Sequence, residues 1–184
     1  LTIKELKIQT SDGVDLLAWF SMPKSNLPLL VYFHGNSFDI GERAYRIKRY
    51  INNGWGVLLL SWRGFSGNLG KPTEKNLYID GESTIKWIID NLNFDYENLI
   101  IYGESLGCAV AVELGTRYKF KSIILEAPFT SVPDIAQKRY KIYPVKYFVL
   151  DKFDNYSKID KILSPVMIIS GKKDEVVPHC HSNK

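Results

Sequence analysis

The stretch that decides the fold runs from Leu99 to Ala111 and reads LIIYGESLGCAVA. A short apolar run is followed by the pattern G-x-S-x-G, at Gly103, Ser105 and Gly107, and then by small residues that can open a helix. This succession of strand, sharp turn and helix is what a nucleophile elbow requires. The serine at its apex takes a strained backbone conformation, so the flanking positions must be nearly free of side chains. The stretch therefore predicts a Ser105 hydroxyl that projects from the end of a strand.

The sequence around this turn alternates between apolar runs and helical patterns. Thr2–Gln9 and Val14–Met22 flank a turn sequence and predict a leading hairpin. Helices are predicted over Glu42–Asn53 and Tyr78–Leu92. Buried strands are predicted at Leu29–Phe33, Val57–Leu60, Leu99–Tyr102, Ser122–Leu125 and Val166–Ile169. The alternation predicts an α/β fold with a mostly parallel sheet, helices on both faces, and the hairpin as antiparallel edge strands.

The composition describes an ordinary globular chain. Of its 184 residues, 45% are hydrophobic, which is enough for a single domain over residues 1–184. The formal charge of +4 is mild and the basic residues are mixed with acidic ones, which argues against nucleic-acid binding. Cys108 and Cys180 lie far apart and lack the paired spacing of a metal site, so we expect two free thiols.

The sequence shows no membrane span and no signal peptide. No apolar run approaches the roughly 18 residues that a spanning helix needs. We therefore expect a cytoplasmic protein. The sequence begins at Leu1 rather than at Met, which leaves an N-terminal anchor, and with it association with a membrane surface, open as the alternative.

Residues 128–164 interrupt the alternation with a segment rich in Tyr, Phe and Lys. Segments of this length in compact domains are usually functional or carry short helices of their own, so we expect a short lid here. Its aromatic side chains either line an apolar acyl pocket or pack the segment onto the body of the domain. These aromatics are Phe129, Tyr140, Tyr143, Tyr147, Phe148 and Phe153.

A serine nucleophile needs a base, a carboxylate that orients the base, and an oxyanion hole. Asp174 follows the strand at 166–169 and comes after Ser105 in the chain, the order expected of the acid; Glu175 is the near alternative. The backbone N–H of Leu106 and that of Asn36 or Ser37 are candidate oxyanion donors. His34 precedes this loop, and we expect it to shape the loop rather than to act as the base.

Several motifs together resemble the α/β-hydrolase superfamily, specifically its small serine aminopeptidase-like, lysophospholipase-like and acyl-protein thioesterase-like members. They are YFHGN at 32–36, WRGFSG at 62–67, GKPT at 70–73, YGESLG at 102–107, APFTS at 127–131 and GKKDEVVP at 171–178. The resemblance covers almost the whole chain. It implies Ser105 as nucleophile, Asp174 as the triad acid, Asn36 and Leu106 as oxyanion donors, and a structural role for the turn around Arg63.

The resemblance also implies a histidine base after one further helix and strand. Fewer residues follow Asp174 than the dozen or so that a parallel crossover takes, so we expect the base to lie outside this chain. His179 and His181 are the substitutes that the sequence offers, although first-turn positions of a following helix explain them as well. A strand at Val166–Ile169 without an outer neighbour leaves an apolar edge, so we expect the polypeptide to continue past Lys184 or a second copy to cover this strand.

These observations predict a serine hydrolase that cleaves esters or thioesters of acyl chains or small lipids through an acyl-enzyme on Ser105. The alternative is a non-catalytic binding module that lacks the triad histidine, and a lesser one is an aminopeptidase-like amide hydrolase. We expect no organic cofactor. We also expect no metal: the spacing of Asp174, His179 and His181 could suggest a metal site, but the sequence places no further ligand with them.

Overall fold

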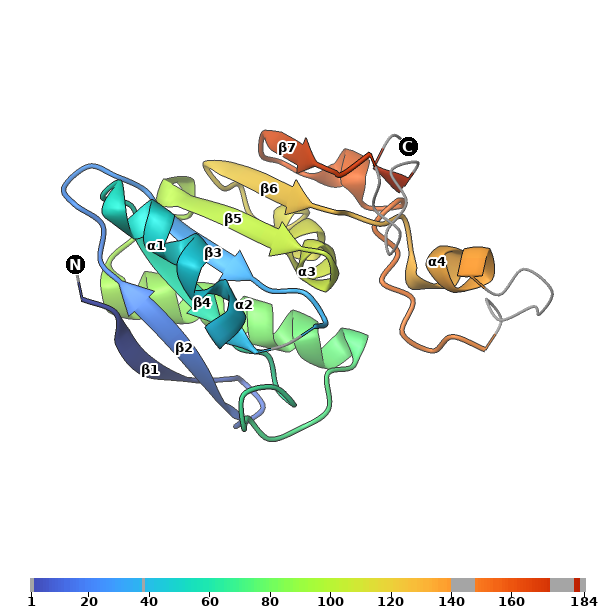
Figure 1. Cartoon of the computed structure of the whole chain (residues 1–184), viewed down its shortest axis with the longest axis horizontal. Helices are drawn as coiled ribbons and strands as arrows, with labels where there is room; N and C mark the ends of the chain where they lie inside the picture. Colours follow the sequence, from blue (N-terminus) through green and yellow to red (C-terminus); the bar gives the residue numbers. More distant parts are fainter. Residues whose placement is uncertain (1, 38, 140–147, 173–180, 183–184) are drawn as a thin grey trace.

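A computed structural model describes residues 2–37, 39–139, 148–172 and 181–182. Within them, seven strands form one sheet in the order β1-β2-β4-β3-β5-β6-β7 (Figure 1). The strands are β1 (Lys4–Gln9), β2 (Asp15–Ser21), β3 (Leu29–Phe33), β4 (Gly56–Leu60), β5 (Leu99–Glu104), β6 (Ser122–Glu126) and β7 (Val166–Ile169). The hairpin β1–β2 pairs antiparallel and joins β4 antiparallel, whereas β4, β3, β5, β6 and β7 run parallel. The predicted mostly parallel sheet with an antiparallel hairpin at one edge is confirmed.

Helices cover both faces of the sheet. Helix α1 (Ala44–Asn52) buries Ile47 and Ile51 against one face, beside Leu30 and Leu59 of the strands. Helices α2 (Glu74–Leu92) and α3 (Leu106–Gly115) pack on the other face and against each other. Helix α3 is apolar almost all round because it lies between the sheet and its neighbours. None of the helices in the described ranges is long and apolar enough to cross a membrane.

Two predicted helix starts are wrong, and local capping explains both. Helix α2 begins at Glu74 rather than at residue 78, because the Thr73 hydroxyl accepts a hydrogen bond from the Asn76 N–H at 3.4 Å and caps the first turn. The helix predicted from residue 42 starts instead as a 3-10 turn, η1 (Ile40–Arg43), capped by the Asp39 carboxylate, and α1 proper begins at Ala44.

The segment between β6 and β7 contains α4 (Val132–Arg139) and the 3-10 turn η4 (Ile159–Lys161). Figure 1 shows α4 beyond the carboxyl ends of β5 and β6. Hydrogen bonds tie the two ends of the segment together: the Val132 N–H donates to the Lys152 carbonyl at 2.9 Å, and the Asn155 amide donates to the Phe129 carbonyl at 2.9 Å. Because α4 lies beyond the carboxyl ends of parallel strands, the segment occupies the edge of the sheet where ligand sites of such folds form.

Strand β7 is the outer strand of the sheet on the side away from the hairpin. Its four apolar side chains, Val166, Met167, Ile168 and Ile169, are between 38% and 59% exposed. This matches the exposed apolar edge predicted from the sequence.

Candidate active site

The turn between β5 and α3 has the geometry of the predicted elbow. Ser105 lies at its apex with φ 49° and ψ −108°, a backbone conformation that side-chain-bearing residues rarely adopt. A Cβ at Gly107 would lie 2.0 Å from the Phe33 carbonyl oxygen, and one at Gly103 would lie 2.6 Å from the Cys108 Cα. Both glycines are therefore required, because strand, turn and helix pass too closely for any side chain.

A cavity of about 540 Å³ opens in front of Ser105. Asn36 and Leu106 line it together with Ser105, so the turn after β5 and the loop after β3 meet at one site. Of the two residues in that loop that are candidate donors, Asn36 lines the cavity and Ser37 is not among its lining residues. The Ser37 carbonyl accepts a hydrogen bond from Arg43 at 2.6 Å. The remaining walls are largely apolar and include Pro72, Phe129, Val132, Ile135, Phe148, Val149, Leu150, Asp151 and Phe153.

Of the six aromatic residues singled out in the segment 128–164, the three within the described residues line the cavity. Phe129 and Phe153 line the cavity and also pack into the main core, where each is 4% exposed. Phe148 lines the cavity while 79% of it is exposed. Tyr140, Tyr143 and Tyr147 lie outside the described residues.

His34 is buried beneath the Asn36 loop and has both ring nitrogens in contact with backbone groups. Its Nδ1 lies 2.7 Å from the Gly35 carbonyl, and its Nε2 lies 3.4 Å from the Trp62 N–H. The Trp62 indole also donates to the His34 carbonyl at 2.9 Å. This pattern requires the neutral tautomer with the proton on Nδ1, and burial lowers the pKa of His34 to about 4. His34 therefore joins the loops after β3 and β4, the shaping role predicted from the sequence.

A partly buried ion-pair network also contacts this loop. Arg43 donates from Nη2 and Nε to the two carboxylate oxygens of Glu104, at 2.7 and 3.1 Å. Its Nη1 donates to the carbonyls of Ser37 and Asp39, at 2.6 and 3.2 Å. The Tyr32 hydroxyl donates to Glu104 at 2.7 Å. Burial alone would raise the pKa of Glu104, but the hydrogen bonds from Arg43 and Tyr32 outweigh it and hold that pKa below its ordinary value.

No pattern in the sequence predicts this network. The available signal was Glu104, a carboxylate at the carboxyl end of an otherwise apolar strand, because a partly buried charge needs a cationic or hydrogen-bonding partner. The sequence does not say which of its many Arg and Lys residues is that partner.

The turn around Arg63 anchors a different part of the site's surroundings. Arg63 is 3% exposed and binds the fully buried Asp80 of α2 at 2.6 and 2.8 Å, while its Nη1 reaches Asp12 of the leading hairpin at 2.8 Å. The Arg63 guanidinium thus ties the hairpin and α2 to the loop after β4.

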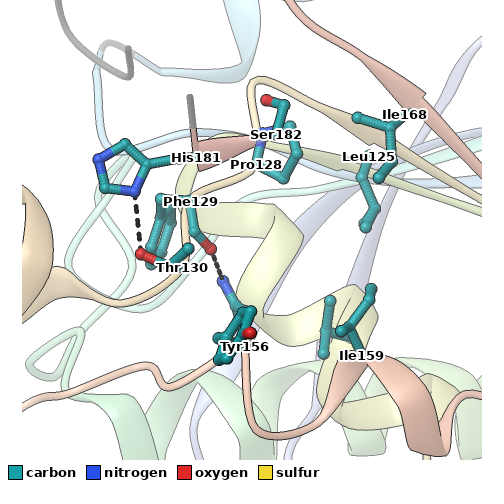
Figure 2. A pocket seen from close by; sticks show the side chains of 11 residues that line it. Leu125, Pro128, Phe129, Thr130, Tyr156, Ile159, Ile168, His181 and Ser182 are labelled. Carbon is teal, nitrogen blue, oxygen red and sulfur yellow. Dashed lines mark hydrogen bonds between the residues drawn. The ribbon is translucent and has the colours of Figure 1, made fainter. Parts of the chain in front are cut away.

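His181 lines a second, smaller cavity of about 50 Å³, together with Pro128, Ile159 and Ile168 (Figure 2). Its Nδ1 lies 2.9 Å from the Thr130 hydroxyl. Phe129 contributes to both cavities, but Ser105 lines only the larger one. Asp174, its alternative Glu175 and His179 lie outside the described residues, so their roles stay predictions.

Cys108 is fully buried behind the elbow, and its thiol donates to the carbonyls of Gly103 and Glu126 at 3.1 and 3.2 Å. Burial raises the pKa of this thiol well above its ordinary value. The Cys108 side chain therefore acts as a small core residue, as predicted, while Cys180 lies outside the described residues.

Comparison with known proteins agrees with this fold, although no protein-family model matches the chain. The chain is 37% identical over 178 residues to alpha/beta hydrolase domain-containing protein 17B of Homo sapiens. The match covers 94% of this chain and 59% of that protein. It is 30% identical over 177 residues to an uncharacterized protein of Mycobacterium tuberculosis. This match covers 95% of this chain and 63% of that protein. The chain thus spans about three fifths of the length of these relatives.

Among solved structures, the chain superposes on the Pyrococcus furiosus esterase Pf2001 with a TM-score of 0.80 at 21% identity. The superposition covers 99% of this chain and 76% of that one, and it confirms the fold predicted from the sequence. With the strand order and the superposition in agreement, the chain has the α/β-hydrolase fold, and its sequence is similar to that of a human alpha/beta hydrolase domain-containing protein.

Proposed function

We propose that this protein is a serine hydrolase that cleaves carboxylic esters or thioesters, with Ser105 as its nucleophile. The observation that carries the proposal is one cavity lined by Ser105, on its strained elbow, and by Asn36 and Leu106. Leu106 is the first residue of α3, so its N–H has no partner within the helix and sits at the positive end of the helix dipole. The elbow, the loop and the cavity together have the parts that an acyl transfer needs.

In the proposed reaction, the Ser105 Oγ attacks the carbonyl carbon and the carbonyl oxygen becomes an oxyanion. The N–H groups of Asn36 and Leu106 donate hydrogen bonds to that oxyanion. The alcohol or thiol leaves with a proton, and water then hydrolyses the acyl-enzyme. The base in this reaction is a histidine oriented by Asp174. The chemistry needs no cofactor.

The walls of the cavity favour an acyl chain or small lipid as the substrate. Its volume lies within the range of small-molecule sites, and most of its lining residues are apolar. Supporting the ester assignment, the superposed Pyrococcus furiosus protein is itself an esterase. The other predicted contacts, with a membrane surface and with a second copy through Val166–Ile169, also stay predictions, as does the cytoplasmic location.

Reaction with a fluorescent fluorophosphonate tests the assignment of Ser105. The protein expressed from its full reading frame should be labelled, Ser105→Ala should not, and Ser157→Ala, which removes an exposed hydroxyl in the segment 128–164, should be labelled like the parent. Hydrolysis of nitrophenyl esters of increasing acyl length should follow the same pattern. Equal labelling of parent and Ser105→Ala would refute the nucleophile, and a folded parent with neither labelling nor turnover would favour the binding module. Turnover of aminoacyl amides in preference to esters would favour the amide hydrolase.

A further inference from the structure

The proposed oxyanion site is assembled from two separate pieces of chain. The Leu106 N–H follows β5 and the elbow, whereas the Asn36 N–H belongs to the loop that follows β3. Parallel pairing fixes β3 beside β5 up to the pair Phe33 and Gly103, but neither donor belongs to this ladder. Something beyond the sheet must therefore set the spacing between the two donors.

Arg43 joins these two pieces directly. Its guanidinium holds both oxygens of Glu104, the residue before Ser105, at 2.7 and 3.1 Å. The same guanidinium donates to the carbonyl of Ser37, the residue after Asn36, at 2.6 Å. Each end of the bridge thus lies one residue from a group of the proposed site.

The bridge is rigid as well as short. The Arg43 side chain is only 7% exposed, and a planar guanidinium that donates in several directions fixes the angle as well as the distance between its partners. The Tyr32 hydroxyl holds Glu104 from a second side at 2.7 Å. The loop also approaches the elbow closely, since a Cβ at Gly35 would lie 3.4 Å from the Ser105 Cβ.

We propose that Arg43 is a positioning residue that sets the Asn36 N–H against the elbow and so completes the oxyanion hole. This inference rests on the proposed function, because it assigns Arg43 to the same site. Arg43 does not line the cavity and acts through Glu104 and Ser37.

Arg46, in the first turn of α1 three residues after Arg43, provides a matched control. It binds the two oxygens of Glu126 at 2.5 and 2.9 Å, and within the described residues its hydrogen bonds go to Glu126, Tyr32 and Tyr45. It comes no closer to Glu104 than 3.9 Å. Arg46→Gln therefore removes a guanidinium from a neighbouring ion pair while leaving the bridge to Ser37 in place.

The test measures the rate of fluorophosphonate labelling of Ser105 in parent, Arg43→Gln and Arg46→Gln proteins. Misplacing one oxyanion donor should slow labelling by about 10- to 100-fold in Arg43→Gln, with little change in probe affinity. Arg46→Gln should label within about threefold of the parent, as a residue outside the site should. If Arg43→Gln does not fold, Arg43→Lys serves instead: it keeps a positive charge beside Glu104 but lacks the fork, so slower labelling is expected again.

Hydrogen exchange of the amides at residues 35–37 gives a second readout that needs no chemistry at Ser105. Exchange there should quicken in Arg43→Gln and stay at the parent rate in Arg46→Gln. Equal slowing of labelling in both variants, or labelling of a folded Arg43→Gln at the parent rate, would overturn the proposal. If the parent itself is not labelled, the proposed function fails, while faster exchange confined to Arg43→Gln still supports the bridge and unchanged exchange refutes it.

Discussion

The state of His34 makes the stability of this protein depend on pH between about pH 6.5 and pH 4. Folded His34 is neutral, because its Nδ1–H donates to the Gly35 carbonyl and its Nε2 faces the Trp62 N–H. Burial lowers its pKa to about 4 in the folded protein, against about 6.5 in an unfolded chain. As the pH falls below that unfolded value, the unfolded chain takes up a proton that the folded protein does not.

The sign and the size of the effect follow from this difference. Since the unfolded state binds more protons, the free energy of unfolding falls as the pH falls; the His34 contribution is fully present above about pH 6.5 and is lost by about pH 4. With these two pKa values, the loss between pH 8 and pH 5 is about 2 kcal/mol, and the loss over the whole window is about 3 kcal/mol.

Urea unfolding followed by tryptophan fluorescence at pH 8, 7, 6 and 5 measures this loss in the parent and in His34→Gln. All other titrating groups are common to both proteins, so the difference between the two profiles isolates His34. The parent should lose about 2 kcal/mol more than the variant between pH 8 and pH 5. Parallel profiles would refute the reasoning, as would an NMR titration of the His34 imidazole with a midpoint near its ordinary pKa.

Two further pairs of substitutions, each a variant with its control, test the contacts that support the site, by the same urea assay. Gly107→Ala should cost more than about 3 kcal/mol, because its Cβ would lie 2.0 Å from the Phe33 carbonyl oxygen. The control Gly67→Ala, at a positive φ but with no atom within 4 Å of the added Cβ, should cost about 1 kcal/mol, and equal costs would contradict the close approach at Gly107. Arg63→Met should cost about 3–5 kcal/mol, because it leaves the Asp80 carboxylate buried without the guanidinium that pairs with it. The control Asp12→Asn, at a side chain that is 38% exposed, should cost less than about 1 kcal/mol. A similar cost for the two would place the stabilisation in the exposed half of the network instead.

Much of the fold could be predicted because its signals are local. Unbroken apolar runs such as Leu29–Phe33 and Leu99–Tyr102 have the pattern of strands covered on both faces, and the structure places both in the centre of the sheet. The turn at Ser105 could also be predicted from the sequence, since Gly103, Ser105 and Gly107 reflect a steric requirement confined to a few residues. The starts of α1 and α2 were misplaced because a capping hydrogen bond depends on backbone geometry that hydrophobic spacing does not record.

Some residues of the candidate site could likewise be predicted from the sequence, and others could not. Ser105, Leu106 and Asn36 could be named from the sequence, because each follows a strand whose carboxyl end lies at one edge of a parallel sheet. The Arg43 bridge could not, because its partners lie 6 residues away at Ser37 and 61 residues away at Glu104. Nothing in the residues between them records that contact.

The sequence by itself therefore determined the order of strands and helices, the strained turn at Ser105 and the edge of the sheet where a site would form. The tertiary structure decided what surrounds that turn: which loop residue lines the cavity, which aromatic side chains form its walls, and which arginine joins the loop to the elbow. The physical reason is that backbone conformation and burial pattern are set by neighbours along the chain. The partner of a buried charge such as Glu104, in contrast, is chosen by packing between distant segments.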